Sequence, residues 1–274
     1  MIRVAVPAKI NLALLVGERR QDGFHEVATV LQRIDLCDRL ELSEGSGLAV
    51  EGFAGDTLVR RALEALASAA GVEPRWRVRL EKRIPLSAGL GGGSADAAAA
   101  LVLANRTLAA RLPPERLVEV AAGIGADVPF FLTPGPKLAE GVGERLSRLE
   151  LPQGYWIVLA LPPDAVKASS GAVYARFDEL GGGAAFPERR AELAAALASC
   201  RRPLDLASLP ANDLAEAAGR PHVADELLAS DAFRADVSGA GPAVYGLFER
   251  RGDAHRAARR CRRLGRVWVA APVW

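Results

Sequence analysis

The sequence predicts an α+β fold, in which helices and strands are mixed along the chain. Residues 2–14 carry apolar side chains at every even position, with Lys9 and Asn11 together on the opposite face, as in a half-buried β-strand. Residues 84–112 join a glycine-rich loop to a long alanine-rich helix, which a pair of prolines ends. The second half of the chain mixes further strands and helices, which is the pattern of an α+β protein.

A Pro/Gly-rich stretch at residues 134–136 and a turn at Pro152 predict a domain boundary. We therefore expect an N-terminal domain at residues 1–150 and a C-terminal domain at residues 151–274. Besides the elements above, hydrophobic periodicity predicts strands at 36–42, 76–80, 155–161, 243–248 and 267–270, and helices at 58–70, 115–125, 188–198, 212–218, 222–229 and 253–263.

The composition is that of a soluble globular protein. Of the 274 residues, 50% are hydrophobic and 25% are charged, and the net charge is +2. This small charge argues against a dedicated nucleic-acid binder, and no stretch of about 18 apolar residues is present to span a membrane. We interpret the basic run at residues 256–263 as the solvated face of an amphipathic helix, rather than as an RNA-binding helix.

Cysteine use indicates a compartment rather than a chemistry. Cys37, Cys200 and Cys261 lie far apart and form no CxxC pair, so neither a disulfide framework nor a zinc site follows. The first residues lack the charged start, apolar core and cleavage site of a signal peptide. We therefore expect a cytoplasmic protein without a membrane or nucleic-acid partner, and the sequence does not indicate its oligomeric state.

The most informative motif is the loop Gly89-Leu90-Gly91-Gly92-Gly93-Ser94, directly before the predicted long helix. Glycines let the backbone approach a ligand closely, and the start of a helix offers unpaired N–H groups and the positive end of the helix dipole. Together these features form a cradle for phosphate groups, to which Ser94 would add a hydroxyl for phosphate or Mg²⁺.

Three other interpretations of this loop exist. A Walker A loop ends in Gly-Lys-Ser/Thr, but no lysine is near. A dinucleotide-binding fingerprint needs a glycine where Ser94 stands and an acidic residue on a following strand, whereas Pro113 and Pro114 lead into another helix. The third is a flexible turn without a ligand, and four glycines entering a long helix argue against it.

The run Pro85-Leu86-Ser87-Ala88-Gly89-Leu90-Gly91-Gly92-Gly93-Ser94-Ala95 resembles the ATP-binding motif of the GHMP kinases, the relatives of galactokinase, homoserine kinase and mevalonate kinase. The resemblance implies a two-domain GHMP kinase fold with the active site in the cleft between the domains. It also implies ATP with Mg²⁺ held mainly by the phosphates, so we assign no metal ligand. The residues expected to bind ATP are Pro85, Leu86, Ser87, Ala88, Gly89, Leu90, Gly91, Gly92, Gly93, Ser94 and Ala95.

Further segments resemble one branch of these kinases, the diphosphocytidyl-methylerythritol kinases, in the same order along the chain. They are Pro7–Leu12, Asp22–His25, Gln32–Asp38, Gly125–Phe131, Gly141–Glu144, Asn212–Leu214 and Ser238–Pro242. This resemblance implies ATP-dependent phosphorylation of a hydroxyl of 4-diphosphocytidyl-2-C-methyl-D-erythritol, in the non-mevalonate pathway to isoprenoid precursors. The partner is then a small-molecule cytidine-diphosphate substrate.

Two alternatives to this function remain open at the level of sequence. The first is another GHMP kinase, of the homoserine or mevalonate type, against which the loop Asp22–His25 argues. The second is a non-catalytic nucleotide-binding or RNA-binding module, which the small net charge opposes.

The resemblance assigns catalytic roles to two residues. Asp127 would take the proton from the substrate hydroxyl, although its position before Pro129 also suits a helix cap. Lys9 would orient Asp127 and stabilise the developing alkoxide, whereas a strand lysine often simply faces solvent. Its shared face with Asn11 favours the site.

The resemblance implies that the substrate is bound by Asn11, Phe24, His25 and Ser170. Phe24 would stack on the cytosine and His25 would hydrogen-bond its edge. The alternative is that Phe24 belongs to the core and His25 to an ordinary loop. Ser170 follows a predicted strand, where the family often has Ser-Thr near the substrate.

Three positions depart from the family pattern. Phe24 replaces the usual tyrosine, which keeps the aromatic face and loses a hydroxyl. Asp96 follows the glycine-rich loop, where a carboxylate near phosphate is unexpected, so it either faces away or helps to hold Mg²⁺ through water. Ala240 replaces a serine in the loop that begins at Ser238, which removes one hydroxyl contact.

Overall fold

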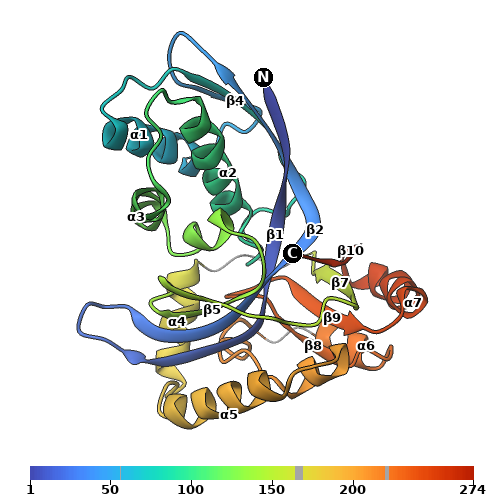
Figure 1. The fold of residues 1–274 in the computed structure, drawn as a ribbon. Helices are drawn as coiled ribbons and strands as arrows, with labels where there is room; N and C mark the ends of the chain where they lie inside the picture. The colour runs from blue at the N-terminus through green and yellow to red at the C-terminus, as the bar shows by residue number, and fades with distance from the viewer. Residues whose placement is uncertain (56, 164–168, 220–221) are drawn as a thin grey trace. The chain divides into compact units, whose positions relative to one another are not determined.

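The computed structural model describes residues 1–55, 57–163, 169–219 and 222–274. They form two compact units (Figure 1), of which unit 1 contains residues 1–8, 36–86 and 91–134 and unit 2 contains residues 9–35, 87–90 and 135–274. The units differ from the sequence-based domains 1–150 and 151–274, because the first two strands contribute residues to both. Within the part of the chain that the structure describes, none of the helices combines the length and hydrophobicity that a membrane span requires.

Unit 1 combines strands with helices that lie on one side of them (Figure 1). Its strands are the start of β1 (Ile2–Arg19), the end of β2 (His25–Glu44), β3 (Ala49–Glu51) and β4 (Trp76–Glu81), and its helices are α1 (Leu58–Ala70), α2 (Gly92–Thr107), α3 (Pro114–Ile124) and the short η1 (Pro129–Leu132). β4 pairs antiparallel with β2, with Leu40 opposite Leu80, and parallel with β3. These leucines form one apolar core with Leu63 of α1 and Leu101 of α2.

Unit 2 contains two sets of strands. In the first, β5 (Lys137–Gly141) pairs antiparallel with the first half of β2 and with β6 (Arg145–Arg148), and β11 (Pro272–Val273) also pairs with β2. The second is an antiparallel sheet in the order β10 (Arg266–Ala270), β7 (Trp156–Leu161), β9 (Val244–Phe248) and β8 (Arg234–Val237). The helices of this unit are α4 (Ser170–Glu179), α5 (Phe186–Ser199), α6 (Val223–Leu228) and α7 (Arg251–Cys261), with the short η2 (Pro203–Ser208) and η3 (Arg262–Leu264). α6 and α7 pack on the second sheet, where Val158, Leu227 and Phe248 share an apolar core.

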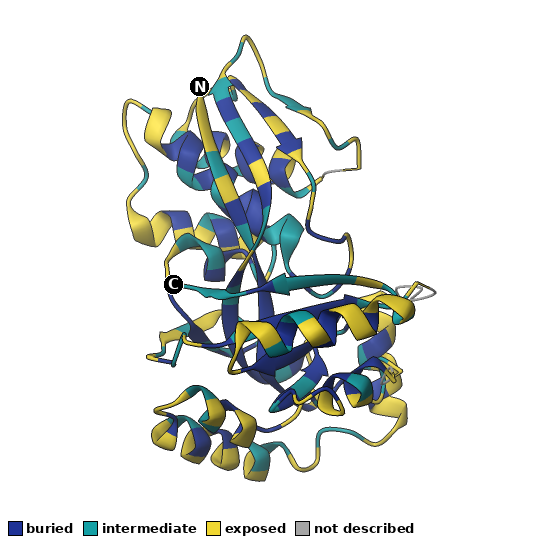
Figure 2. Cartoon of the chain, turned by 90° about the vertical axis from the view of Figure 1, so that its right-hand side faces the viewer, coloured by how far each residue is buried: buried dark blue, intermediate teal, exposed yellow. Residues whose placement is uncertain are grey.

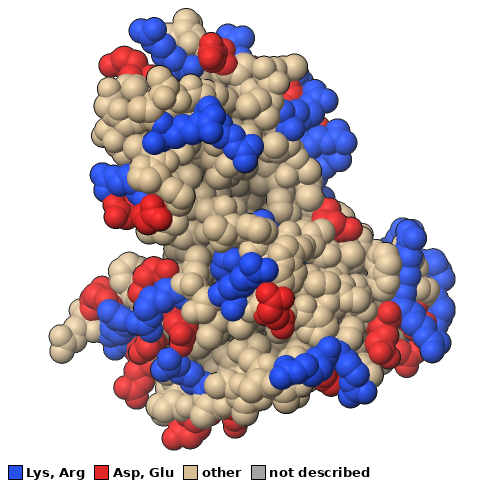
Figure 3. Space-filling view, viewed as in Figure 1, with Lys and Arg blue, Asp and Glu red and all other residues tan. Residues whose placement is uncertain are grey.

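α7 has the amphipathic pattern that the sequence predicts. Its buried residues are Ala254, Ala257, Ala258 and Cys261, and its other face is exposed (Figure 2). Arginines gather over this helix with acidic residues among them (Figure 3). Arg256 pairs with Asp253, and Arg260 and Arg263 both pair with Glu226 of α6. The solvated-helix interpretation is confirmed, and carboxylates neutralise part of its positive charge.

The helix after the glycine-rich loop is shorter than predicted. α2 ends at Thr107, whereas the alanine-rich pattern runs to residue 112. The side chain of Asn105 accounts for the early end, because its amide donates to the carbonyl of Leu112 at 3.0 Å and its oxygen accepts from the N–H of Leu112 at 2.8 Å. The asparagine thus folds the following loop back onto the last turn of the helix.

The predicted helix at residues 212–218 is wrong, because residues 213–219 form turns. The side-chain amide of Asn212 donates to the carbonyls of Val237 and Gly239 at 2.9 and 2.7 Å. The N–H of Asn212 donates to the Asp236 carboxylate at 2.9 Å. Asn212 therefore bonds the neighbouring strand and loop rather than starting a helix. α4 and β8 have no counterpart among the predicted elements.

A buried arginine holds this part of unit 2 together. The guanidinium of Arg234 donates to the carbonyls of Leu209 and Pro210, to the carboxylate of Asp236 at 3.1 Å and to the hydroxyl of Tyr245 at 3.3 Å. Both members of the Arg234–Asp236 ion pair have side chains that are 7% exposed. Removing one partner would leave the other charge buried and uncompensated.

We therefore expect Arg234→Met to lower the free energy of unfolding by about 3–5 kcal/mol, measured by urea denaturation. The control is Arg256→Met, which removes an exposed pair with Asp253 and should change the free energy by less than about 1 kcal/mol. Equal effects of the two substitutions would contradict a structural role for the buried pair.

Candidate active site

The first half of the glycine-rich loop is bound within unit 2. The carbonyl of Gly89 accepts from the hydroxyl of Ser238 at 3.0 Å, and the carbonyl of Leu90 accepts from the N–H of Lys9 at 2.9 Å. The Ser238 hydroxyl also accepts from the N–H of Asn11 at 3.4 Å. The structure thus brings together three segments that the sequence analysis selected separately, namely the loop, the first strand and the Ser-Gly-Ala-Gly loop.

Position 89 requires a glycine, both for its backbone conformation and for its close contact with the carbonyl of Ser238. Its φ of +80° lies in the left-handed region that favours glycine, and a Cβ atom would lie 2.0 Å from the carbonyl oxygen of Ser238. Ser87 also has a positive φ, of 58°, which is uncommon for a residue with a side chain. The backbone of this loop is therefore fixed by close contacts, which argues against a flexible turn.

The second half of the loop opens α2 in unit 1. Gly91, with a φ of 68°, is the N-cap, and Gly92, Gly93 and Ser94 form the first turn. The N–H groups of a first turn have no partner within the helix, and they lie at the positive end of its dipole. A Cβ at position 92 would lie 3.0 Å from the side chain of Ile84, so glycine also permits close packing of this helix start. This geometry suits a phosphate cradle.

A buried ionic cluster lies beside the start of α2. The ammonium of Lys82 donates to Asp38 on β2 and to Asp96 on α2. Burial alone lowers the pKa of Lys82, but the Asp96 and Asp38 carboxylates raise it above its usual value, so the ammonium stays charged. Asp96, a carboxylate that was unexpected beside the glycine-rich loop, is thus paired with a cation inside unit 1.

Lys82 is a residue that the sequence analysis missed as part of the site. The available signal was its type, because lysine is rare among the 35 basic residues of this chain. Lys82 neutralises two buried carboxylates. Through Asp96 it binds the helix that begins at the glycine-rich loop.

Lys9 and Asn11 form a hydrogen-bonded pair in unit 2. The ammonium of Lys9 donates to Oδ1 of Asn11 at 2.7 Å, and Nδ2 of Asn11 donates to the hydroxyl of Thr29 at 2.8 Å. Thr29 in turn donates to the carbonyl of Ala13 at 2.7 Å. This chain fixes the orientation of the asparagine amide, and Lys9 is buried rather than facing solvent. The sequence prediction of a shared face is confirmed, while Thr29 was not predicted.

Asp127 lies in unit 1, in the turn between α3 and η1, and is half-buried. The short helix begins at Pro129 with Val128 as its N-cap residue. Asp127 therefore lies one position before the N-cap residue of this short helix.

Phe24 lies at the tip of the loop between β1 and β2 in unit 2. Its side chain is exposed, with 63% of its surface accessible, so the core interpretation is wrong. The loop is shaped by Asp22, which accepts from the N–H of Phe24 at 3.1 Å and pairs with Arg20. These contacts, the Phe24 N–H first, lower the pKa of Asp22. An exposed aromatic face on a shaped loop is available to stack on a base.

His25 is the first residue of β2 and is buried, unlike an ordinary loop residue. Nε2 of its ring lies 2.8 Å from Oδ1 of Asp178 on α4. The ring packs on Tyr174, at a centroid distance of 5.0 Å and an interplanar angle of 32°, and meets Phe177 edge-on at 6.3 Å. The sequence analysis missed these three partners because it did not predict α4.

Ser170 is the first residue of α4 and is exposed. Ser169 caps the helix, since its hydroxyl accepts from the N–H of Ala172 at 3.2 Å. Ser170, Tyr174 and Asp178 are spaced by four residues, so they share one face of the helix. Ser170 thus lies on the helix face that contacts His25, one turn before Tyr174.

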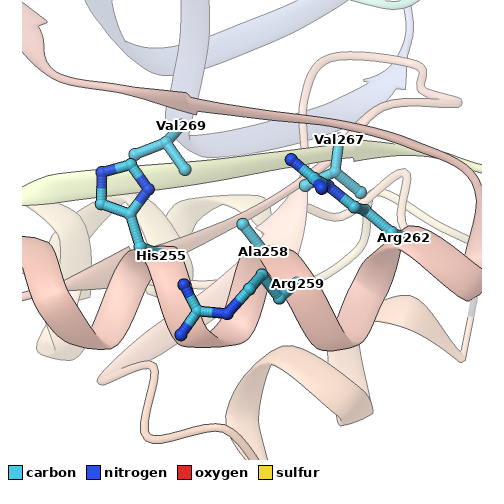
Figure 4. Close-up of a pocket in the computed structure, with 6 residues that line it drawn as sticks. All are labelled: His255, Ala258, Arg259, Arg262, Val267 and Val269. Carbon is cyan, nitrogen blue, oxygen red and sulfur yellow. The ribbon is translucent and has the colours of Figure 1, made fainter.

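A pocket of about 370 Å³ lies elsewhere in unit 2 (Figure 4). It is lined by His255, Ala258, Arg259, Arg262, Val267 and Val269. These come from α7, η3 and β10, and none of the residues that the sequence analysis assigned to ATP, catalysis or substrate is among them. This pocket is therefore not part of the candidate active site.

A glycine-rich loop that enters a helix, with the N–H of Lys9 bonded to it, is the arrangement expected of the small-molecule kinases of the GHMP class, and comparisons with known proteins show this class directly. The family model of the GHMP kinases N terminal domain matches residues 57–135, and that of the GHMP kinases C terminal matches residues 223–267. The chain belongs to the 4-diphosphocytidyl-2-C-methyl-D-erythritol kinase family within this class.

The full length of the chain supports this membership. It is 38% identical to the 4-diphosphocytidyl-2-C-methyl-D-erythritol kinase of Geobacter sulfurreducens, over 99% of this chain and 98% of the relative. It is 40% identical to the enzyme of that name from Pelotomaculum thermopropionicum, over 96% and 94%. A crystal structure of 4-(cytidine 5'-diphospho)-2C-methyl-D-erythritol kinase matches with a TM-score of 0.84 at 35% identity, covering all of both chains. The mevalonate kinase of Methanococcus jannaschii, with a TM-score of 0.76 at 12% identity over 100% of this chain and 98% of the other, shares the fold.

The close approach at Gly89 gives a direct test of the loop. Gly89→Ala should displace the loop from Ser238 and lower kcat/KM for ATP by about 10²-fold, since a displacement of about 1 Å has that effect on a positioned reactant. Gly71→Ala is the matched control, because Gly71 has a similar φ of +66° with open space around it. It should cost about 1 kcal/mol of stability and leave kcat/KM within about twofold. Equal kinetic losses would mean that the backbone conformation, not the contact with Ser238, matters.

Proposed function

We propose that this kinase transfers the γ-phosphoryl group of ATP to a hydroxyl of 4-diphosphocytidyl-2-C-methyl-D-erythritol, a step toward isoprenoid precursors. The observation that carries this proposal is the 38% identity to a relative of that name over 99% of the chain. Mevalonate and homoserine kinases share the fold at only 12% and 17% identity, and so offer weaker support for their own substrates.

The chemistry assigns one role to each of two residues. The substrate oxygen attacks the γ-phosphorus, the bond from that phosphorus to the bridging oxygen breaks, and ADP leaves. In our proposal the Asp127 carboxylate accepts the proton of the hydroxyl, and Lys9 stabilises the negative charge that develops on the oxygen. The ammonium of Lys9 donates to Oδ1 of Asn11 at 2.7 Å, and this bond orients the lysine for its proposed role.

The glycine-rich loop fits a triphosphate that carries Mg²⁺. When bound, Mg²⁺ neutralises phosphate charge in the transition state. The described residues contain no cluster of three or more His, Cys, Asp or Glu side chains that could hold a metal ion. Asp38 and Asp96 both accept from Lys82, and the Ser94 hydroxyl at the helix start is an oxygen that suits Mg²⁺. We propose that the phosphates hold the ion, with Ser94 as an additional ligand.

The cytidine part of the substrate is assigned to the loop between β1 and β2. Phe24 offers an exposed ring for stacking, which contributes about 1–3 kcal/mol per base in nucleic-acid complexes. His25 directly follows it and is held by α4, so it can read one edge of the base. We also propose that the enzyme works in the cytoplasm without a nucleic-acid partner, on the grounds of its cysteine spacing and its net charge of +2.

The substrate assignment predicts a simple result. With Mg²⁺ and ATP, release of ADP should depend on 4-diphosphocytidyl-2-C-methyl-D-erythritol and should be negligible with mevalonate, homoserine or galactose. A coupled assay of ADP formation measures this. Comparable turnover of any of the other three compounds would refute the assignment, while the kinase class would stand.

The catalytic assignment predicts that Asp127→Asn lowers kcat by roughly 10²–10⁴-fold, because the amide cannot accept the proton. Its melting temperature should stay within a few degrees of the native value. Lys9→Met should act similarly, and the double variant should be less impaired than the product of the two losses, since the residues act on one proton transfer. Glu119→Gln, which removes an exposed ion pair on α3, is the control with normal kcat. A near-normal kcat for Asp127→Asn would remove it from the mechanism.

A further inference from the structure

Three side chains of α4 contact the ring of His25. Tyr174, Phe177 and Asp178 are spaced by three and four residues, so one face of the helix presents all three to the ring. Tyr174 packs on the ring, Phe177 meets it edge-on, and Asp178 bonds Nε2 at 2.8 Å. The side chain of His25 is 6% exposed and that of Asp178 is 34% exposed. The ring is therefore held by packing and by one charged hydrogen bond.

The chemistry of the pair decides where the proton lies. An ionised carboxylate can only accept hydrogen bonds, so Nε2 of His25 must carry a hydrogen to bond Asp178. Fixing one ring nitrogen also fixes the orientation of the other, as a carboxylate does for the histidine of a catalytic triad. Nδ1 lies on the other side of the ring from Asp178 and is the nitrogen left for a ligand.

We propose that Asp178 is a positioning residue for base recognition: it holds the His25 ring and its Nε2 proton, so that Nδ1 meets the edge of the cytosine. This inference rests on the proposed function, since it gives the cytidine site its orienting group. Asp178 acts through His25 and does not itself touch the substrate. It determines how well the base is bound and leaves the phosphoryl-transfer step unchanged.

The position of the proton can be tested without any substrate. The chain has three histidines, so ¹⁵N-histidine labelling gives few ring signals, and His222→Asn and His255→Asn variants assign them. At mildly alkaline pH, His25 of the native protein should carry its hydrogen on Nε2, protected from exchange with water. Asp178→Ala should lose this protection, and Glu179→Gln should keep it, because Glu179 pairs with Arg176 instead. A native His25 with its hydrogen on Nδ1 would overturn the proposal.

Kinetics test the consequence for the substrate. Asp178→Ala should raise KM for the cytidine-diphosphate substrate about tenfold, while kcat and KM for ATP stay within about twofold, because a lost orienting bond of about 1.4 kcal/mol corresponds to that factor. Asp178→Asn keeps an accepting oxygen and should raise KM less. Glu179→Gln should have native kinetics. An unchanged KM in Asp178→Ala, or a loss confined to kcat, would contradict the positioning role.

A double-substitution cycle separates positioning from stability. In a His25→Gln background, Asp178→Ala should add no further increase in KM, because the residue acts through the imidazole. Additive losses would mean that Asp178 acts on its own or merely stabilises α4, and would refute the proposal. Failure of the native enzyme to use the cytidine substrate would instead refute the proposed function, and the position of the His25 proton would still test the Asp178–His25 pairing.

Discussion

The hydrogen bond from the Ser238 hydroxyl to the carbonyl of Gly89 is the contact on which the candidate site depends. It joins the glycine-rich loop to the loop after β8, at a separation that only glycine permits. The same hydroxyl accepts from the N–H of Asn11, whose side chain orients Lys9. One hydroxyl thus sets the position of the first half of the glycine-rich loop relative to the strand that carries the proposed catalytic lysine. The Ser238 hydroxyl can do this because it donates one hydrogen bond and accepts another.

Buried charges play a similar role within each unit. Lys82 joins the start of α2 to β2 through Asp96 and Asp38, and Arg234 fixes the segment before the turns at residues 213–219. Such pairs add little net stability compared with apolar residues of the same size, because desolvation offsets their attraction. Their effect is directional, since a charge with several fixed partners permits one arrangement of the backbone. We attribute the geometry of the loop ends to these clusters rather than to the apolar cores.

The sequence predicts those parts of the structure that depend on the residue pattern within one short segment. The alternation in β1 places Lys9 and Asn11 on one face, and the glycines at 89–93 predict the loop that enters α2. Contacts between distant segments were not predictable, because no local pattern encodes them: Asp178 meets His25 across 153 positions, and Ser238 meets Gly89 across 149. The mistaken helix at residues 212–218 has the same origin, since Asn212 bonds residues 25 and 27 positions away. Helical periodicity was outweighed there by tertiary hydrogen bonds.

The sharing of β1 and β2 between the two units has a consequence for synthesis of the chain. Residues 27–31 of β2 pair with residues 137–141 of β5, which leave the ribosome about 100 residues later. At about 5–20 residues per second, this part of β2 is synthesised on the order of 10 s before the strand that pairs with it. Unit 1 is completed at almost the same moment, because its last residue is 134 and β5 begins at Lys137. The apolar side chains of β2 lack this partner strand in the meantime, so we expect slow translation to lengthen their exposure to other chains.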